Sequence, residues 1–148
     1  MFQKILVPLD GSTQAEQALD FAANMAKDSK AELVLVRVPI LEQVLAPAAS
    51  VLDTYHLEMS FAKSTEKAQA YFDELVGDYE EQPFAVRPLI VPGTPAEIIC
   101  QTALAEQVDL IVISSHGRTG WRKLVLGSVA EEVLKTADVP VLLVKNKS

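Results

Sequence analysis

Short apolar runs alternate with longer stretches of helical periodicity along the whole chain. Five apolar runs bounded by turn residues predict strands, and these are Phe2–Leu9, Ala31–Val38, Phe84–Val91, Asp109–Ser114 and Val139–Lys145. Apolar residues at helical spacing predict four helices between them, over Thr13–Ser29, Thr54–Glu80, Thr94–Gln107 and a last segment that starts at Ser128. Near-continuous apolar strands that alternate with helices are typical of a parallel sheet covered on both faces. The pattern therefore predicts an α/β fold in three layers, with helices on both faces of the sheet.

Hydroxyl residues followed by glutamate predict where three of the helices begin. Three such pairs, each three positions apart, indicate capping boxes: Thr13 with Glu16, Thr94 with Glu97, and Ser128 with Glu131. The longest helix is expected to turn an apolar stripe inward, through Leu57, Phe61, Ala68, Phe72, Leu75, Val76 and Tyr79. Pro88 has no backbone N–H for a ladder, so the third strand is expected at an edge of the sheet.

Length and composition indicate one folded unit. The chain has 148 residues, of which 49% are hydrophobic and 22% charged, so we expect a single domain over residues 1–148. Cys100 is the one cysteine in the sequence, so no internal disulfide can form. No apolar run approaches the ~18 residues of a membrane-spanning helix, and Lys4 and Asp10 interrupt the start too early for a signal peptide. We therefore expect a cytoplasmic protein without a membrane segment.

The charge balance disfavours some partners and favours another. Thirteen Lys and Arg against twenty Asp and Glu give a formal net charge of −7, which disfavours nucleic acids and anionic membrane surfaces as partners. The segment from Ser114 to Gly127 nevertheless carries three basic residues and no acidic one, namely Arg118, Arg122 and Lys123. Such a segment suits a small anion, and a solvated basic loop is the alternative.

Residues that follow the strands are the first candidates for a ligand site. In open α/β sheets, ligands bind beyond the carboxyl ends of the strands. After the fourth strand comes a turn rich in glycine and hydroxyl groups, Ser114–Gly120, and the same basic segment ends at Gly127 and Ser128, where a helix begins. Backbone amides of such a turn and helix start are suited to phosphate. The sequence contains neither a P-loop nor a G-x-G-x-x-G dinucleotide fingerprint.

Three segments together resemble the universal stress protein family. They are ILVPLDGS near the start, the V-x-G-T-P turn before the third helix, and SSHGRTGWRKLVLGSVAEEVLKTADVPVLLVK at the end. Nucleotide-binding members carry G-x2-G-x9-G-[ST], which this chain matches at Gly117, Gly127 and Ser128, whereas Ser114 stands at the first glycine. The resemblance implies an adenine nucleotide alpha hydrolase-like fold, with a parallel sheet in the order 3-2-1-4-5. It also implies that ATP, or AMP, ADP or cAMP, binds between the first and fourth strands.

The same resemblance implies roles for individual residues. Asp10 would lie near the ribose and the phosphates with their Mg²⁺, and Val38 would contact adenine. The full set implied for the nucleotide is Pro8, Leu9, Asp10, Val38, Ile113, Ser114, His116, Gly117, Arg118, Gly127, Ser128 and Val129. Ser114 in place of the glycine is expected to weaken or alter binding without abolishing it. For His116, a contact that stabilises the turn, a contact to phosphate and a role as general base all stay open.

The last strand is apolar and would expose an unpaired sheet edge. The resemblance implies a homodimer through this strand, with Val139, Val141, Leu142, Leu143 and Val144 at the interface. The leading hypothesis is a small dimeric protein that binds an adenine nucleotide and acts in stress response or signalling. A dimeric interaction module of the same fold without nucleotide is one alternative, and a slow ATPase is another. Fast catalysis is not expected, because the sequence shows no paired carboxylates or metal-ligand cluster at readable spacing.

Overall fold

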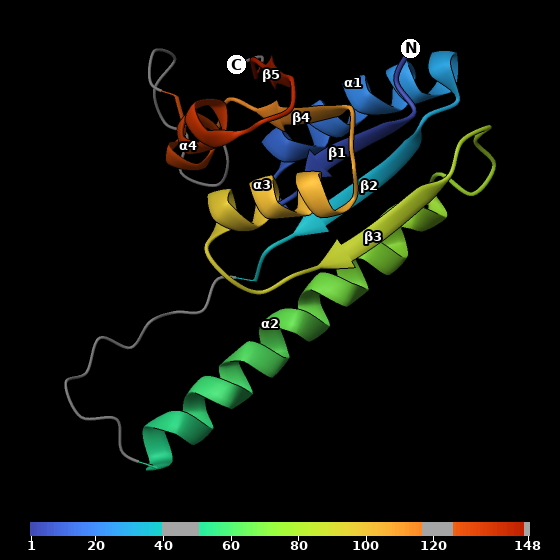
Figure 1. Cartoon of the computed structure of the whole chain (residues 1–148). Helices are drawn as coiled ribbons and strands as arrows, with labels where there is room; N and C mark the ends of the chain where they lie inside the picture. Colours follow the sequence, from blue (N-terminus) through green and yellow to red (C-terminus); the bar gives the residue numbers. More distant parts are fainter. Residues whose placement is uncertain (40–50, 117–125, 147–148) are drawn as a thin grey trace.

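The computed structural model describes residues 1–39, 51–116 and 126–146 (Figure 1). Strands and helices alternate along these residues, in the order β1 (Lys4–Pro8), α1 (Thr13–Ser29), β2 (Glu32–Arg37), α2 (Val51–Gly77), β3 (Val86–Ile90), α3 (Pro95–Ala105), β4 (Leu110–Ser114), α4 (Ser128–Thr136) and β5 (Val141–Val144). Every predicted strand and helix is present, which confirms the α/β class.

All neighbouring strands of the sheet run parallel, in the order β3-β2-β1-β4-β5. The expected order 3-2-1-4-5 is therefore confirmed. Ile5 in β1 lies opposite Leu33 in β2 and Leu110 in β4, so β1 is at the centre of the sheet. β3 with Pro88 occupies one edge, as the missing backbone donor predicted. β5 occupies the other edge.

Helices cover both faces of the sheet and make the three layers. On one face, α1 packs against the strands through small side chains, so that the helix approaches the sheet closely; these are Ala15, Ala18, Ala22 and Ala26. Phe72 of α2 joins the same core. On the other face, α3 and α4 pack over Leu6, Val34 and Ile111. Near-continuous apolar strands follow from this arrangement, because each strand is covered twice.

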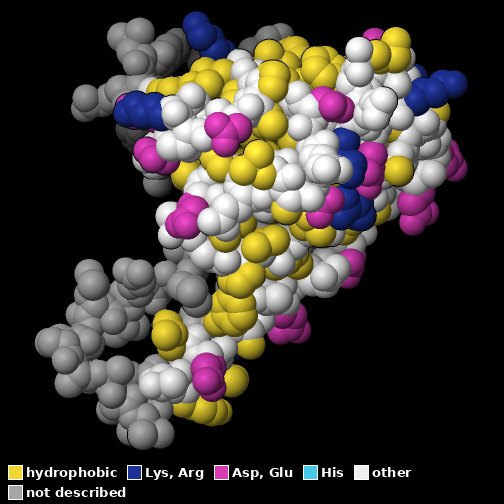
Figure 2. Space-filling view, in the orientation of Figure 1, with side chains coloured by type: hydrophobic (Ala, Val, Ile, Leu, Met, Phe, Trp, Pro, Cys, Tyr) yellow, Lys and Arg dark blue, Asp and Glu magenta, His cyan; other side chains and the backbone are white. Residues whose placement is uncertain are grey.

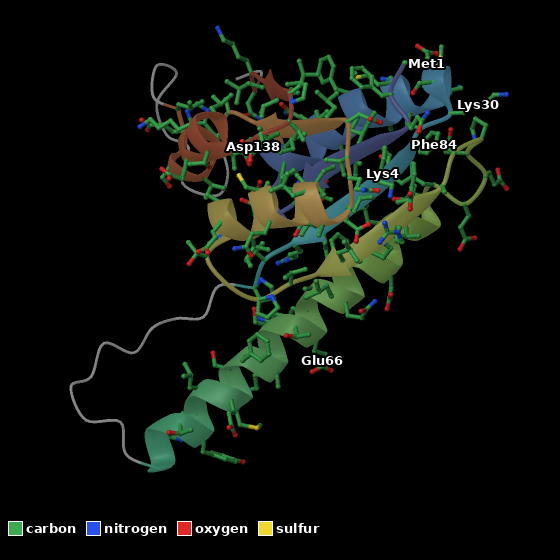
Figure 3. All side chains as sticks on the ribbon, in the orientation of Figure 1. Met1, Lys4, Lys30, Glu66, Phe84 and Asp138 are labelled. Atoms are coloured by element: carbon green, nitrogen blue, oxygen red, sulfur yellow. The ribbon has the colours of Figure 1, made fainter. Side chains whose placement is uncertain are left out.

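The long helix α2 is buried only in its second half. Figure 1 shows its amino end projecting beyond the sheet, and Glu66, labelled in Figure 3, marks about its middle. Phe72 is fully buried, whereas Leu57 is 37% exposed and Tyr55 and Met59 are exposed as well. The space-filling view shows hydrophobic side chains on this projecting part (Figure 2). The expectation that Leu57 points into the core was wrong, because helical periodicity cannot tell how far the sheet extends beneath a helix.

Two of the expected helix caps lie one residue earlier than predicted. The N-cap of α1 is Ser12, whose Oγ accepts a hydrogen bond from the Ala15 amide, and not Thr13. The N-cap of α4 is Gly127, and Ser128 is the first helical residue. Thr94 does cap α3 by position, but its side chain makes no capping hydrogen bond. Val139, expected within the last strand, precedes β5 and packs against the core.

The amino ends of the strands are occupied by paired charges. Lys4 Nζ lies 3.7 Å from Glu32 Oε2, and the guanidinium of Arg87 forms ion pairs with both Glu32 and Glu106. Figure 3 labels Lys4 on the side of the sheet away from α4. The hydrogen bond from Arg87 holds the pKa of Glu106 below its usual value. These opposite charges therefore neutralise one another at the amino ends of three neighbouring strands.

None of the helices within the described ranges combines the length and the apolar character needed to span a bilayer.

Candidate functional site

The strand order places a switch point between β1 and β4. The chain moves outward from β1 through β2 to β3, and then crosses to β4 on the other side of β1. Such a point is where open α/β sheets bind ligands, beyond the carboxyl ends of the strands. The residues that follow β1 and β4, together with the start of α4, therefore form the candidate site.

A tight turn connects β1 to α1 at this edge. The Ser12 amide donates to Asp10 Oδ1 at 2.9 Å, and the Ser12 hydroxyl then caps α1. Gly11 between them has a φ of 83°, in the left-handed region that favours glycine. The carboxylate of Asp10 is consequently held, half-buried, at the carboxyl end of β1.

A cation lies beside this turn, and the sequence analysis did not single it out. Arg37 ends β2, and a Cβ placed on Gly11 would lie only 2.9 Å from Arg37 Nη1. The guanidinium carbon also lies 4.9 Å from the centre of the Tyr71 ring, in a cation–π contact. Tyr71 donates to Glu16 Oε1 at 3.0 Å, and burial together with this carboxylate raises the pKa of the phenol. The one available signal was a charged residue at the end of an otherwise apolar strand.

Ser114, at the end of β4, is buried and uses its hydroxyl within the chain. Ser114 Oγ donates to the backbone carbonyl of His116 at 2.5 Å. The side chain that replaces the motif glycine is therefore accommodated by a hydrogen bond to the turn that follows. This contact also places His116 next to the end of β4.

Ser115, also missed in the sequence analysis, joins three elements at this point. Its amide donates to the Val144 carbonyl at 2.8 Å, and its carbonyl accepts from the Gly127 amide at 2.7 Å. Ser115 thereby ties the end of β4 both to β5 and to the start of α4. Its side chain is buried, and its Oγ lies 3.0 Å from His116 Nδ1, so His116 makes a contact within the turn that follows β4.

The start of α4 presents backbone donors at the same edge. The first intrahelical bond of α4 runs from the Glu131 amide to the Gly127 carbonyl at 2.9 Å. The amides of Ser128, Val129 and Ala130 precede it and have no partner within the helix. In the part of the chain that the structure describes, no side chain caps this helix. Amides of this kind, at the positive end of a helix, suit a phosphate.

A comparison with known sequences identifies the family. The model of the universal stress protein family matches residues 1–145. The chain belongs to the universal stress protein family. Universal stress protein MJ0577 of Methanocaldococcus jannaschii is 34% identical over 158 residues, an alignment that spans 100% of this chain and 98% of that protein.

Solved structures of the family share the fold. The structure of MJ0577 superimposes with a TM-score of 0.87 at 34% identity and covers 100% of this chain and 99% of its own. A universal stress protein in complex with cAMP gives a TM-score of 0.63 at 22% identity, covering 99% of this chain and 98% of its own. An Arabidopsis thaliana member with AMP bound gives a TM-score of 0.67 at 18% identity, covering 99% of this chain and 93% of its own. At these lower identities the likeness concerns the fold.

Three of the residues expected at the site of this universal stress protein lie in one layer of the core. Val38, Ile113 and Val129 all belong to the core layer between the sheet and the helices α3 and α4. Pro8 ends β1, and Leu9 is buried and donates its amide to the Val36 carbonyl. Gly117 and Arg118 lie outside the described residues.

The described residues contain no group of three or more His, Cys, Asp or Glu side chains placed to hold a metal ion. A Mg²⁺ ion near Asp10 would accordingly depend on oxygen ligands from the nucleotide.

Proposed function

We propose that this universal stress protein binds ATP or another adenine nucleotide at the carboxyl ends of β1 and β4. The observation that supports it most is the start of α4, where the amides of Ser128, Val129 and Ala130 have no partner within the helix. The 2.7 Å bond from the Gly127 amide to the Ser115 carbonyl joins this helix start to the end of β4. Phosphate is the natural ligand of such amides, and the switch point of the sheet is where a nucleotide would lie.

Each part of the nucleotide has residues that suit it in this proposal. Ser128 and Val129 would offer amides to the phosphates, beside Gly127, whose own amide donates to the Ser115 carbonyl. Gly117 and Arg118, outside the described residues, would contribute as well. Adenine would contact Val38, with Ile113 and Val129 in the same apolar layer. The ribose would lie near Pro8, Leu9 and Asp10, at the end of β1. His116 would contact the ligand from the turn after Ser114.

In this proposal, Ser114 in place of the motif glycine changes the affinity for the nucleotide and does not prevent binding. Its hydroxyl bonds to the His116 carbonyl, so the added side chain is satisfied internally. We therefore expect an affinity that differs from that of members with the complete glycine motif, with binding retained.

Two solved structures of the family support the proposed ligand class. Two proteins of this fold were solved with cAMP and with AMP. An adenine nucleotide is accordingly the ligand we propose, with a role in stress response or signalling. Mg²⁺ would neutralise phosphate charge, and Asp10 is the carboxylate positioned to orient it. Hydrolysis of ATP would be slow at most.

We also propose that the protein is a homodimer through β5. Among the described residues, β5 pairs with β4 along one edge only, and Leu142 in this strand is 38% exposed. Val141 and Leu143 pack partly against the core of the chain itself, and Val144 is buried in it. These three, and Val139, would thus contribute to an interface mainly through their backbone or their position, whereas Leu142 would contribute its side chain.

Thermal unfolding with and without Mg-ATP tests the nucleotide proposal. Ligand at a hundred times its dissociation constant should stabilise the native protein by ~2.7 kcal/mol, measured as a rise in Tm. Gly127→Val places a side chain beside the amides of α4 and should remove that rise. Gly77→Val is the matched control, because a Cβ there meets no described atom within 4 Å, and it should keep the rise.

The outcomes separate the candidate functions. Without any rise in Tm at millimolar ATP, the proposal is wrong and a dimeric interaction module of the same fold becomes the better hypothesis. Where ATP binds, phosphate release by the native protein and by Asp10→Ala distinguishes a binding protein from a slow ATPase.

A further inference from the structure

A chain of hydrogen bonds connects Asn146, two residues beyond the end of β5, to the candidate site. Asn146 Nδ2 donates to the Gln14 carbonyl at 3.1 Å and to Gln17 Oε1 at 3.2 Å, both in α1. Asn146 Oδ1 accepts from Ser115 Oγ at 3.2 Å, and Ser115 Oγ lies 3.0 Å from His116 Nδ1. The amide of one half-buried side chain therefore links α1, β4 and the turn that carries His116.

The direction of every bond in this chain follows from the Gln14 carbonyl. A backbone carbonyl can only accept, so the NH₂ group of Asn146 must face Gln14 and its oxygen must face Ser115. The Ser115 hydroxyl has one proton, which it donates to that oxygen. Its remaining bond, to His116 Nδ1, must then be one that it accepts. His116 consequently carries a proton on Nδ1.

We propose that Asn146 is a positioning residue of the nucleotide site, acting through Ser115 to hold His116 in the tautomer with its proton on Nδ1. The proposal rests on the proposed function, since the site it positions is the one assigned to the nucleotide. In a neutral ring of this form Nε2 is an acceptor. His116 then favours a donor of the ligand, such as a ribose hydroxyl, over a phosphate oxygen.

The tautomer can be measured in the ligand-free protein. Nitrogen NMR of the His116 ring, at a pH where the ring is neutral, should show Nδ1 protonated and Nε2 unprotonated. In Asn146→Ala the Ser115 hydroxyl is free to donate to Nδ1, so the proton should move to Nε2. Asn24→Ala, at an exposed asparagine of α1, should leave the ring unchanged. A proton on Nε2 in the native protein, or a ring that does not respond to Asn146→Ala, overturns the proposal.

Titration with ATP gives the second readout. Loss of one positioning hydrogen bond should weaken binding about tenfold in Asn146→Ala and in Ser115→Ala, and leave Asn24→Ala unchanged. Unchanged affinity in both variants overturns the positioning role. If the native protein does not bind ATP, the proposed function fails as well as the positioning role built on it, whereas the ring measurement still decides whether Asn146 sets the tautomer.

Discussion

Gly11 illustrates how a single residue shapes the turn at the candidate site. With a φ of 83° and Arg37 Nη1 2.9 Å from where a Cβ would lie, alanine would be strained and would displace the guanidinium. We expect Gly11→Ala to lower the free energy of unfolding by about 1–2 kcal/mol, measured by urea denaturation. Gly77→Ala, at an open position in the last turn of α2, should not lower the free energy of unfolding. Equal losses in the two variants would contradict this account of Gly11.

Asp109 makes stability depend on pH at the opposite end of the sheet. Its Oδ2 accepts from the Gln3 amide at 2.6 Å and from the Lys4 amide at 2.8 Å. These bonds, with that of Gln3 the larger cause, lower its pKa in the folded protein. A carboxyl with a lowered folded pKa stabilises the protein above its unfolded pKa of about 4, and this stabilisation is lost as the pH falls through the folded pKa.

Asp109→Asn tests that dependence by urea unfolding at several pH values. The side chain is exposed, so we expect a loss of only ~1 kcal/mol near neutral pH, shrinking as the pH drops below about 4. Asp28→Asn, at an exposed acid of α1, is the control and should show no such loss. A deficit for Asp109→Asn that persisted unchanged in acid would be inconsistent with the lowered pKa.

At the scale of elements, α2 divides into a buried and an exposed half. Phe72→Ala should cost about 3–5 kcal/mol of unfolding free energy, because the ring is fully buried against the sheet. Leu57→Ala, on the same sequence stripe, should cost less than about 0.5 kcal/mol, since Leu57 is 37% exposed. Chemical denaturation of both variants measures the difference. Similar costs would mean that the projecting half of α2 is covered.

The elements were predictable where the local pattern is strong. The succession of strands and helices along the chain and the parallel sheet follow from the apolar runs. The edge position of β3 follows from Pro88. Helix starts were less predictable, because Ser12 and Thr13 are adjacent hydroxyl residues and only the turn at Gly11 makes Ser12 the cap. The prediction that Leu57 is buried was wrong for a different reason, because its burial depends on how far the neighbouring sheet extends.

At the scale of the whole molecule, most residues now proposed for the site were expected from the resemblance to the family. Contacts between residues far apart in the sequence could not be predicted in this way. Asn146 meets Gln14 across 132 positions of sequence, and nothing in the local pattern signals that meeting. The role of Ser115 could not be predicted, because its backbone, more than its side chain, connects the end of β4 to β5 and α4. Such contacts arise from the packing of elements and can be found only once the elements are placed.

The assembly of the molecule is tested at the β5 edge. Val141 and Leu143 pack partly against the chain's own core, so charges there would disturb the fold itself, and Leu142 is the better position. We expect Leu142→Glu to halve the molar mass measured by light scattering, from dimer to monomer. Leu104→Glu, at a leucine of α3 that is 55% exposed, should stay dimeric. A dimeric Leu142→Glu variant would contradict an interface through β5.

The most direct test of the nucleotide site is to record which backbone amides respond to ATP. In a spectrum of the ¹⁵N-labelled protein, added Mg-ATP should shift the amide signals of Gly127, Ser128 and Val129 and those of the turn from Asp10 to Ser12. Signals at the amino ends of the strands, around Lys4 and Asp109, should stay in place. Shifts confined to those amino ends, or no shifts at all, would contradict a nucleotide bound where β1, β4 and α4 meet.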